Sequence, residues 1–187
     1  MAPPVRTAGL LLTMGVLVGA CGDDDQAADT SATSMVLVPD KVNDADIAFA
    51  RSLRARAEVT ADLAALGRER AGDQRVKDLA EVIHEAQRAQ MAMIDEWLRD
   101  WDEPLDPSTS QAGGAEVLAG VETTPNGTAF DRALVEAMIV QLDGEVPIAQ
   151  RELDSGTAVS AVNLADRIVQ EQPGEIEEMQ GLLAELP

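Results

Sequence analysis

Apolar residues recur every three to four positions through four long stretches of this chain. The stretches cover about residues 44–70, 73–101, 130–153 and 158–186 of 187. Such spacing places apolar side chains on one face of an α-helix, whereas a half-buried strand would alternate apolar and polar residues. No alternating run of any length is present in the sequence. The pattern therefore predicts an all-α protein with four amphipathic helices.

A few residues indicate where these helices begin, bend or end. Asp73 stands at the N-cap position of the second helix, and Thr157 offers a cap for the fourth. Pro147 and Pro173 lie inside the third and fourth helices, where the missing N–H group should kink or break each helix. Residues 102–129 contain three prolines and a Gly-Gly pair, so they form a long connection with room for a short helix at 115–120.

The chain also contains an internal repeat. An offset of 85 positions (131 − 46) superposes the first helix pair on the second without a gap. At this offset Leu53 falls on Met138, and we expect both side chains in the core. Two such hairpins bury their apolar stripes against each other as a four-helix bundle. We therefore place a domain at 44–187, with repeat one at 44–101, a linker at 102–129 and repeat two at 130–187. Identical pairs at this offset include Asp46 and Asp131, Leu79 and Leu164, Ile83 and Ile168, and Gln87 and Gln172.

The N-terminal segment has the features of a bacterial lipoprotein precursor. Its apolar part, residues 8–20, is shorter than the roughly 20 residues that span a bilayer and suits a signal peptide. Cys21, the only cysteine, directly follows Val18-Gly19-Ala20. We interpret residues 1–20 as a signal peptide and Cys21 as the lipidated N-terminus, followed by an acidic, disordered tether over 21–43. The alternative is an ordinary signal peptide with an incidental cysteine.

Composition narrows the possible partners and chemistry. The formal net charge is −20, and nucleic acid is not an expected partner, because phosphate binding needs basic clusters. Aromatic residues make up 2% of the chain, which disfavours stacking sites for sugars or bases. An acylated Cys21 leaves no thiol for a disulfide, a metal site or a nucleophile.

Four phrases of the sequence are typical of one known family. They are Asp46-Ile-Ala-Phe49, Gly127-Thr-Ala-Phe-Asp131, Glu136-Ala-Met-Ile139 and Gln172-Pro-Gly-Glu-Ile-Glu-Glu-Met179. Through them the chain resembles the family called domain of unknown function 305, from about residue 44 to its C-terminus. The resemblance implies a ferritin-like bundle of two duplicated hairpins that is secreted or lipid-anchored. It also implies a metal site, with a Met-(Ile/Val)-x-His-His segment in each repeat and a Glu-Met pair one to two turns later; copper handling has been proposed for some members.

The sequence departs from the family pattern at the metal site itself. None of the four His-His positions holds a histidine, and neither Glu-Met position holds a methionine. Soft and borderline metals favour imidazole and thioether ligands, and a guanidinium group has no lone pair to offer. We therefore expect the family fold without its metal site, and no cofactor. The degenerate metal positions are Arg56, Ala57, Asp62, Leu63, Gln141, Leu142, Pro147 and Ile148.

Other polar residues give partial alternatives. Glu81-Val-Ile-His84 matches half of a di-iron carboxylate motif, and the second repeat lacks the other half. His84, Met91 and Met93 could bind Cu(I), although methionine at helical spacing more often fills a core.

Arg56 and Gln141 lie on stripes that should face the core, where polar groups need partners. Arg56 either pairs with Glu136, Asp143 or Glu145 or extends its charged head to solvent.

The sequence as a whole predicts a lipid-anchored, extracytoplasmic helical bundle held at the membrane through Cys21. No arrangement of residues typical of an enzyme is present, so we expect a non-catalytic protein. It would bind an unidentified protein or small ligand, or serve as a structural part of the cell envelope. The alternative is a copper-handling lipoprotein that uses ligands other than those of the family.

Overall fold

The computed structural model describes residues 41–103 and 114–187, and all regular structure in these ranges is α-helical. This confirms the predicted all-α class. The helices are α1 (Asp44–Arg70), α2 (Gln74–Asp100), α3 (Gly114–Glu122), α4 (Thr128–Asp143), α5 (Val146–Ser155) and α6 (Val159–Glu185). None of them is both long and apolar enough to cross a membrane. The predicted signal peptide, Cys21 and most of the tether lie outside the described residues.

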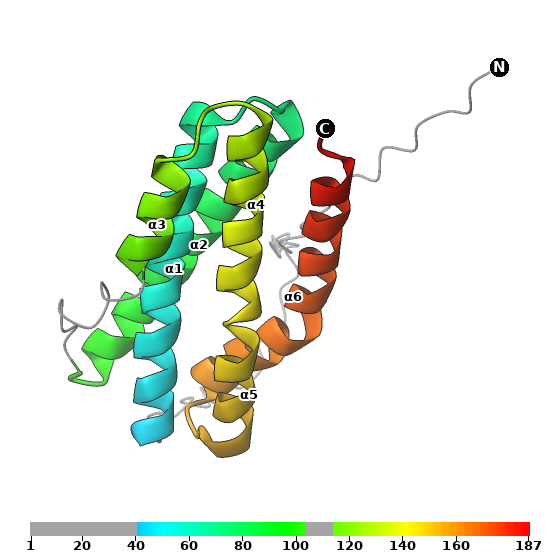
Figure 1. Cartoon of the computed structure of the whole chain (residues 1–187). Helices are drawn as coiled ribbons and strands as arrows, with labels where there is room; N and C mark the ends of the chain where they lie inside the picture. Colours follow the sequence, from blue (N-terminus) through cyan, green and yellow to red (C-terminus); the bar gives the residue numbers. More distant parts are fainter. Residues whose placement is uncertain (1–40, 104–113) are drawn as a thin grey trace, which may run out of the picture. The chain divides into compact units, whose positions relative to one another are not determined.

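The helices form two antiparallel hairpins that pack together. In Figure 1, α1 and α2 make the first hairpin, while α4 and α5 together run beside α1 and return through α6. The short helix α3 lies against α1 and α4, near the predicted position, and Val121 on it is buried. We call the end with the α1–α2 turn the head, and the end with the α5–α6 turn the foot.

Helix starts follow from local capping. The Asn43 side chain accepts hydrogen bonds from the Ala45 and Asp46 amides at 2.8 and 3.1 Å, and Asp46 accepts one from the Asn43 amide at 2.7 Å. These reciprocal bonds satisfy amides that the first turn of α1 leaves unpaired. Asp73 caps α2 as predicted, accepting from the Arg75 amide at 2.8 Å.

Both internal prolines alter their helices, as expected. The predicted third helix is broken between Asp143 and Val146, so that Pro147 falls in the first turn of α5, where its missing N–H costs nothing. Helix α6 continues through Pro173, and Figure 1 shows it changing direction between its orange lower part and its red upper part. Both changes lie in repeat two.

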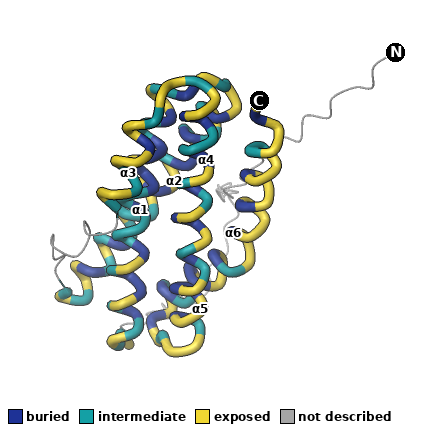
Figure 2. The backbone as a smooth tube through the Cα atoms, in the orientation of Figure 1, coloured by how far each residue is buried: buried dark blue, intermediate teal, exposed yellow. Residues whose placement is uncertain are grey.

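The core has two hydrophobic clusters rather than one. Figure 2 shows buried residues on the inward faces of the helices and exposed residues outside. Leu53 lies in the foot cluster and Met138 in the head cluster, and both are fully buried, as predicted. The head cluster comprises Leu63, Ala64, Ala71, Val76, Ile83, Val121, Phe130, Leu134, Val135, Met138, Leu142, Ile176, Met179 and Leu186. The foot cluster comprises Phe49, Ala50, Leu53, Ile94, Leu98, Ile148, Ala149, Ala158, Ala161, Leu164, Ala165 and Ile168.

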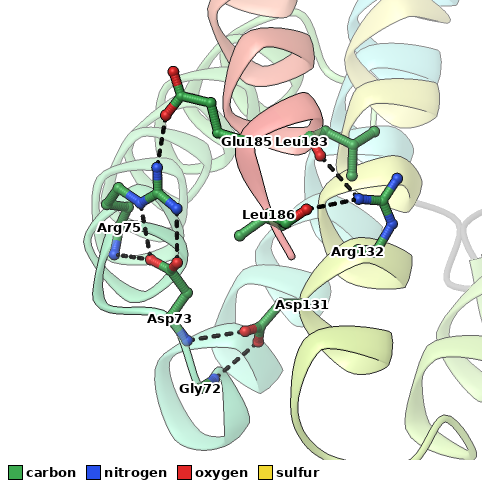
Figure 3. A network of polar contacts seen from close by, with 8 residues as sticks. All are labelled: Gly72, Asp73, Arg75, Asp131, Arg132, Leu183, Glu185 and Leu186. Carbon is green, nitrogen blue, oxygen red and sulfur yellow. Dashed lines mark hydrogen bonds and ion pairs between the residues drawn. The ribbon is translucent and has the colours of Figure 1, made fainter.

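Two aspartates fasten the inter-helix turns across the two hairpins. At the head, Asp131 of α4 accepts hydrogen bonds from the amides of Gly72 and Asp73, both at 2.9 Å (Figure 3). At the foot, Asp46 of α1 accepts from the amides of Thr157 and Ala158, at 2.8 and 2.9 Å. We call these the head clasp and the foot clasp.

The foot clasp corrects one prediction from the sequence. Thr157 does not cap α6: the N-cap residue is Ala158, without a side-chain cap of its own, and the amides are satisfied by the distant Asp46. The two clasps are related residue by residue through the 85-residue offset, because 46, 157 and 158 map on 131, 72 and 73. Such reciprocal contacts are what the predicted internal repeat would produce.

Candidate functional site

The positions that the family resemblance aligns with His-His segments meet between the two hydrophobic clusters. Arg56 on α1 donates from Nη1 to the backbone oxygen and to Oε1 of Gln141 on α4, both at 3.4 Å. Gln141 is buried and Arg56 is half-buried. The adjacent Ala57 and Leu142 are both buried apolar residues. The structure thus brings Arg56 and Gln141 into direct polar contact, whereas Ala57 and Leu142 pack in the core.

The positions that the resemblance aligns with Glu-Met pairs do not converge with Arg56 and Gln141. Leu63 belongs to the head cluster and Ile148 to the foot cluster. Asp62 and Pro147 are exposed. None of the four contributes a ligand-type atom to the interior.

Polar side chains separate the two hydrophobic clusters at this level. Helix α1 passes from Leu53 of the foot cluster to Leu63 of the head cluster, with Arg56 and Thr60 between them. The other long helices change cluster at corresponding places: α2 between Ile83 and Ile94, and α6 between Ile168 and Ile176. We call the intervening side chains the polar layer. It comprises Arg56, Thr60, Gln87, Gln90, Gln141, Glu145 and Gln172.

Glu145 is the most deeply buried charged residue of this layer. Its side chain is 1% exposed and accepts from Gln172 Nε2 at 3.0 Å. Burial raises the pKa of Glu145 to about 7, although the hydrogen bond from Gln172 and the charge of Arg56 act in the opposite direction. The carboxyl is therefore partly protonated near neutral pH.

The structure shows neither the ion pair nor the fully solvent-exposed head expected for Arg56. No ion pair of Arg56 exists within the described residues, and two of its proposed partners, Glu136 and Asp143, are exposed. Glu145 lies close enough for the arginine charge to lower its pKa. Arg56 therefore remains in the layer, held by an amide and near one carboxyl.

Gly144, in the break between α4 and α5, makes room for this arrangement. A Cβ atom at position 144 would collide with the Arg56 guanidinium group. At the break between α4 and α5, Gly144 therefore leaves space for the Arg56 guanidinium group, and Glu145 follows it directly in the chain.

The layer does not fit copper. Its donor atoms are amide and carboxylate oxygens, which are hard ligands, and its cation is a guanidinium group without a free lone pair. Copper at these positions would need imidazole or thioether groups that the chain does not place there. No group of three or more His, Cys, Asp or Glu side chains able to hold a metal occurs in the described ranges.

The alternative donors on α2 are separated from one another. His84 Nδ1 lies 3.1 Å from the backbone oxygen of Ala61, and Glu81 pairs with Arg68. Seven residues of helix rise by about 10.5 Å, so His84 and Met91 are poorly placed to share one ion. Met93 packs against the foot cluster.

Sequence reasoning missed three members of the polar layer: Gln87, Gln90 and Gln172. Glutamine on an amphipathic helix is usually exposed, and nothing in its local pattern distinguishes a buried one. The one sequence feature that could have pointed to buried glutamines is the predicted internal repeat. It pairs Gln87 with Gln172 at the 85-residue offset, and both side chains are buried.

Comparisons of sequence and structure place the chain among known proteins. A sequence profile described as Domain of unknown function (DUF305) matches residues 46–183. A DUF305 protein of Streptomyces coelicolor, described as secreted, is 26% identical with a TM-score of 0.67, over 75% of this chain and 93% of that one. A DUF305 fragment of Deinococcus radiodurans is 28% identical with a TM-score of 0.67, over 78% of this chain and 99% of that one.

The fold is also similar to that of the copper-bound protein CopM. Its Cu(I)-bound form is 22% identical with a TM-score of 0.63, over 73% of this chain and 94% of that one. The Cu(II)-bound form, also 22% identical, has a TM-score of 0.64 and covers 74% and 95% of the two chains. At this identity the likeness concerns the fold alone. A comparison with curated protein sequences gave no match.

Proposed function

The chain belongs to the DUF305 family, and we propose that it is a lipid-anchored, extracytoplasmic helical bundle. In this proposal the polar layer around Arg56 and Gln141 stands in place of the family metal site. It binds a protein or small-molecule partner or supports the envelope structurally, and it catalyses no reaction. The observation that carries this proposal is the contact between Arg56 and Gln141. A fixed cation in that place both lacks metal ligands and repels a metal ion.

The non-catalytic role is supported by the lack of a reactive constellation in the described ranges. His84 is the sole histidine of the chain, and its Nδ1 lies against a backbone carbonyl rather than a serine or threonine hydroxyl. General-base catalysis on a hydroxyl nucleophile needs such a hydrogen bond between base and nucleophile. Glu145 and Glu152 are buried in the bundle, and neither carboxyl makes a hydrogen bond to a serine or threonine hydroxyl within the described residues.

The extracytoplasmic location is supported by the secreted relative and by the sequence around Cys21. Acylation of this cysteine with two or more chains would anchor the domain stably, which one chain would not. The net charge of −20 disfavours binding of the bundle itself to anionic lipid, so the anchor is what holds it at the surface.

The test of this location compares the wild-type protein with Cys21→Ser, and with Ser31→Ala as a control downstream of the processing site. We expect wild type and Ser31→Ala to incorporate labelled fatty acid and to sediment with membranes. Cys21→Ser should lose the label and either keep its signal peptide or leave the membrane. Equal mass, labelling and membrane fraction in wild type and Cys21→Ser would refute the lipid anchor.

Copper handling through His84 is the second candidate, because the fold is shared with a copper-bound protein and His84 is the one imidazole of the sequence. If this candidate were right, purified protein would retain copper, and His84→Ala would lose it while Gln141→Ala would not. We expect neither variant to differ from the wild type in metal content.

A further inference from the structure

The foot clasp contains a second acid that the head clasp lacks. Glu152 of α5 is 1% exposed, and neither of its carboxyl oxygens has a hydrogen-bond donor from an amide or a basic group. The Asp46 carboxyl is its electrostatic neighbour, close enough for a hydrogen bond between the two carboxyls once one of them carries a proton. By the 85-residue offset, Glu152 corresponds to Gly67, which packs on Leu134 and Ala80 near the head clasp.

The carboxyls of Glu152 and Asp46 are both buried beside the α5–α6 turn. Asp46 is fully buried and already accepts the amides of Thr157 and Ala158. A Cβ atom at Gly156 would collide with the Glu152 carboxyl, so the turn closes directly over this side chain. Two ionised carboxylates in contact inside a protein would repel strongly, and no cation pairs with Glu152 within the described residues.

From this geometry we infer that a proton shared between Glu152 and Asp46 fastens the foot of the bundle, making the α5–α6 turn a pH-sensitive latch. Glu152 keeps the proton, and its O–H group donates a hydrogen bond to the Asp46 carboxylate. That carboxylate, in turn, accepts the amides that begin α6. When the open form of the turn lets Glu152 ionise in water, closing the turn requires the proton to be taken up again.

The charges around the pair support this assignment of the proton. Burial raises the pKa of Glu152 to about 8, with the hydrogen bond and the charge of Asp46 acting in the same direction. Burial alone would also raise the pKa of Asp46, but hydrogen bonds from Glu152 and the neighbouring backbone outweigh it and hold this pKa below its ordinary value. Other charged groups near the foot, namely Lys41, Arg151 and Asp154, are exposed.

The direction of the pH effect follows from proton linkage. Glu152 has an ordinary pKa of 4.5 when the turn is open and about 8 when it is closed. The latch is therefore at full strength below about pH 4.5 and weakens as pH rises to about 8, where the effect levels off. The head clasp has no such acid and should not change over this window.

The latch lies where the tether joins the bundle. The Thr157 hydroxyl donates to the backbone oxygen of Lys41, and Asn43 Nδ2 donates to that of Ser155 at 2.9 Å. Residues before Lys41 lead to Cys21 in the sequence. Loosening of the turn would thus free the attachment point of the chain that joins the domain to its N-terminus.

Hydrogen exchange on the full-length protein tests the latch. After correction for the intrinsic rate, opening of residues 154–160 should increase by about tenfold per pH unit between about pH 5 and 8, as expected for one proton. Residues 69–75 at the head clasp serve as the internal control and should show no such slope. Glu152→Gln, which keeps the shape and cannot ionise, should abolish the slope at the foot.

Two results would overturn the inference: a wild-type foot whose opening is independent of pH, or a Glu152→Gln foot with the wild-type slope. If Glu152→Gln fails to fold, Asp46→Asn provides the second variant, because removing the neighbouring charge should reduce the slope. Direct titration of the Glu152 carboxyl by ¹³C NMR in wild type completes the test. A midpoint near 4.5 would contradict the latch, and one well above 6 would support it.

Discussion

Arg56 and Gln141 lie 85 positions apart in the chain and hydrogen-bond to each other at the centre of the bundle. This separation equals the offset of the internal repeat predicted from the sequence, so the contact joins two positions that such a repeat makes counterparts. The two residues also occupy two of the four positions at which the family resemblance predicts histidines, one from each hairpin.

Removal of the Arg56 side chain should destabilise the fold moderately. Its two hydrogen bonds are long, and it is half-buried without an ion pair, so we expect Arg56→Ala to cost about 1–2 kcal/mol rather than the larger loss typical of a broken buried salt bridge. Urea unfolding at pH 7 measures this. Arg151→Ala is the matched control, since this exposed arginine should change stability by no more than about 0.5 kcal/mol.

Gly144→Ala tests the contact between Arg56 and Gln141 without changing either residue. The added Cβ should displace the guanidinium group and produce much of the Arg56→Ala effect, because both changes break the bond to Gln141. In the double variant the two effects should be clearly less than additive. Full additivity would show that Gly144 acts through the helix break and not through Arg56.

Leu53 and Met138 should be about equally costly to truncate. Both are fully buried, one in each cluster, and such truncations to Ala typically cost about 2–5 kcal/mol. Val140→Ala provides the control, because Val140 is 62% exposed and should change stability by less than about 0.5 kcal/mol. A loss below 1 kcal/mol at either buried position would argue against the two-cluster core.

Glu145 should make part of the stability dependent on pH. Burial raises its pKa to about 7 from 4.5, so its contribution is fully present below about pH 4.5 and is lost as pH rises to about 7. Glu145→Gln should flatten the unfolding free energy over this range. In Arg56→Ala the midpoint of Glu145, followed by ¹³C NMR, should move upward, since the lost cation had lowered it. A downward movement would mean that Arg56 does not act on this carboxyl.

Both clasps should lose stability when their aspartates are removed. Asp131→Ala leaves the two amides of the head clasp without their carboxylate acceptor, and Asp46→Ala does the same to the two amides of the foot clasp and also to the Asn43 amide, each variant costing about 1–3 kcal/mol. Near pH 5, where Glu152 is protonated, thermal unfolding should show a loss for both variants, the larger one for Asp46→Ala. If only one of the two variants lost stability, the other aspartate would not contribute to the stability of its clasp.

Much of the fold could be predicted from local sequence. The 3.6-residue spacing of apolar residues marked the long helices, and Asp73 marked a helix start, because both signals act within one or two turns. The cap of α6 could not be predicted in this way, since Asp46 lies 111 residues from Thr157 and the contact exists only once the hairpins pack. The sequence identified Arg56 and Gln141 through a broken motif, but the glutamines that complete the polar layer carry no motif. The pairing of Glu152 with Asp46 likewise depends on the packing of α5 against α1.

The central claim is that the polar layer has replaced the family metal site. Its most direct test is the copper content of purified protein without a histidine tag, after exposure to copper and removal of excess metal. The comparison is between wild type and a variant carrying Arg56→His, Ala57→His, Gln141→His and Leu142→His. We predict no stoichiometric copper in the wild type and a clear gain in the four-histidine variant. Stoichiometric copper in the wild type with micromolar or tighter affinity, lost in Gln141→Ala, would contradict the claim.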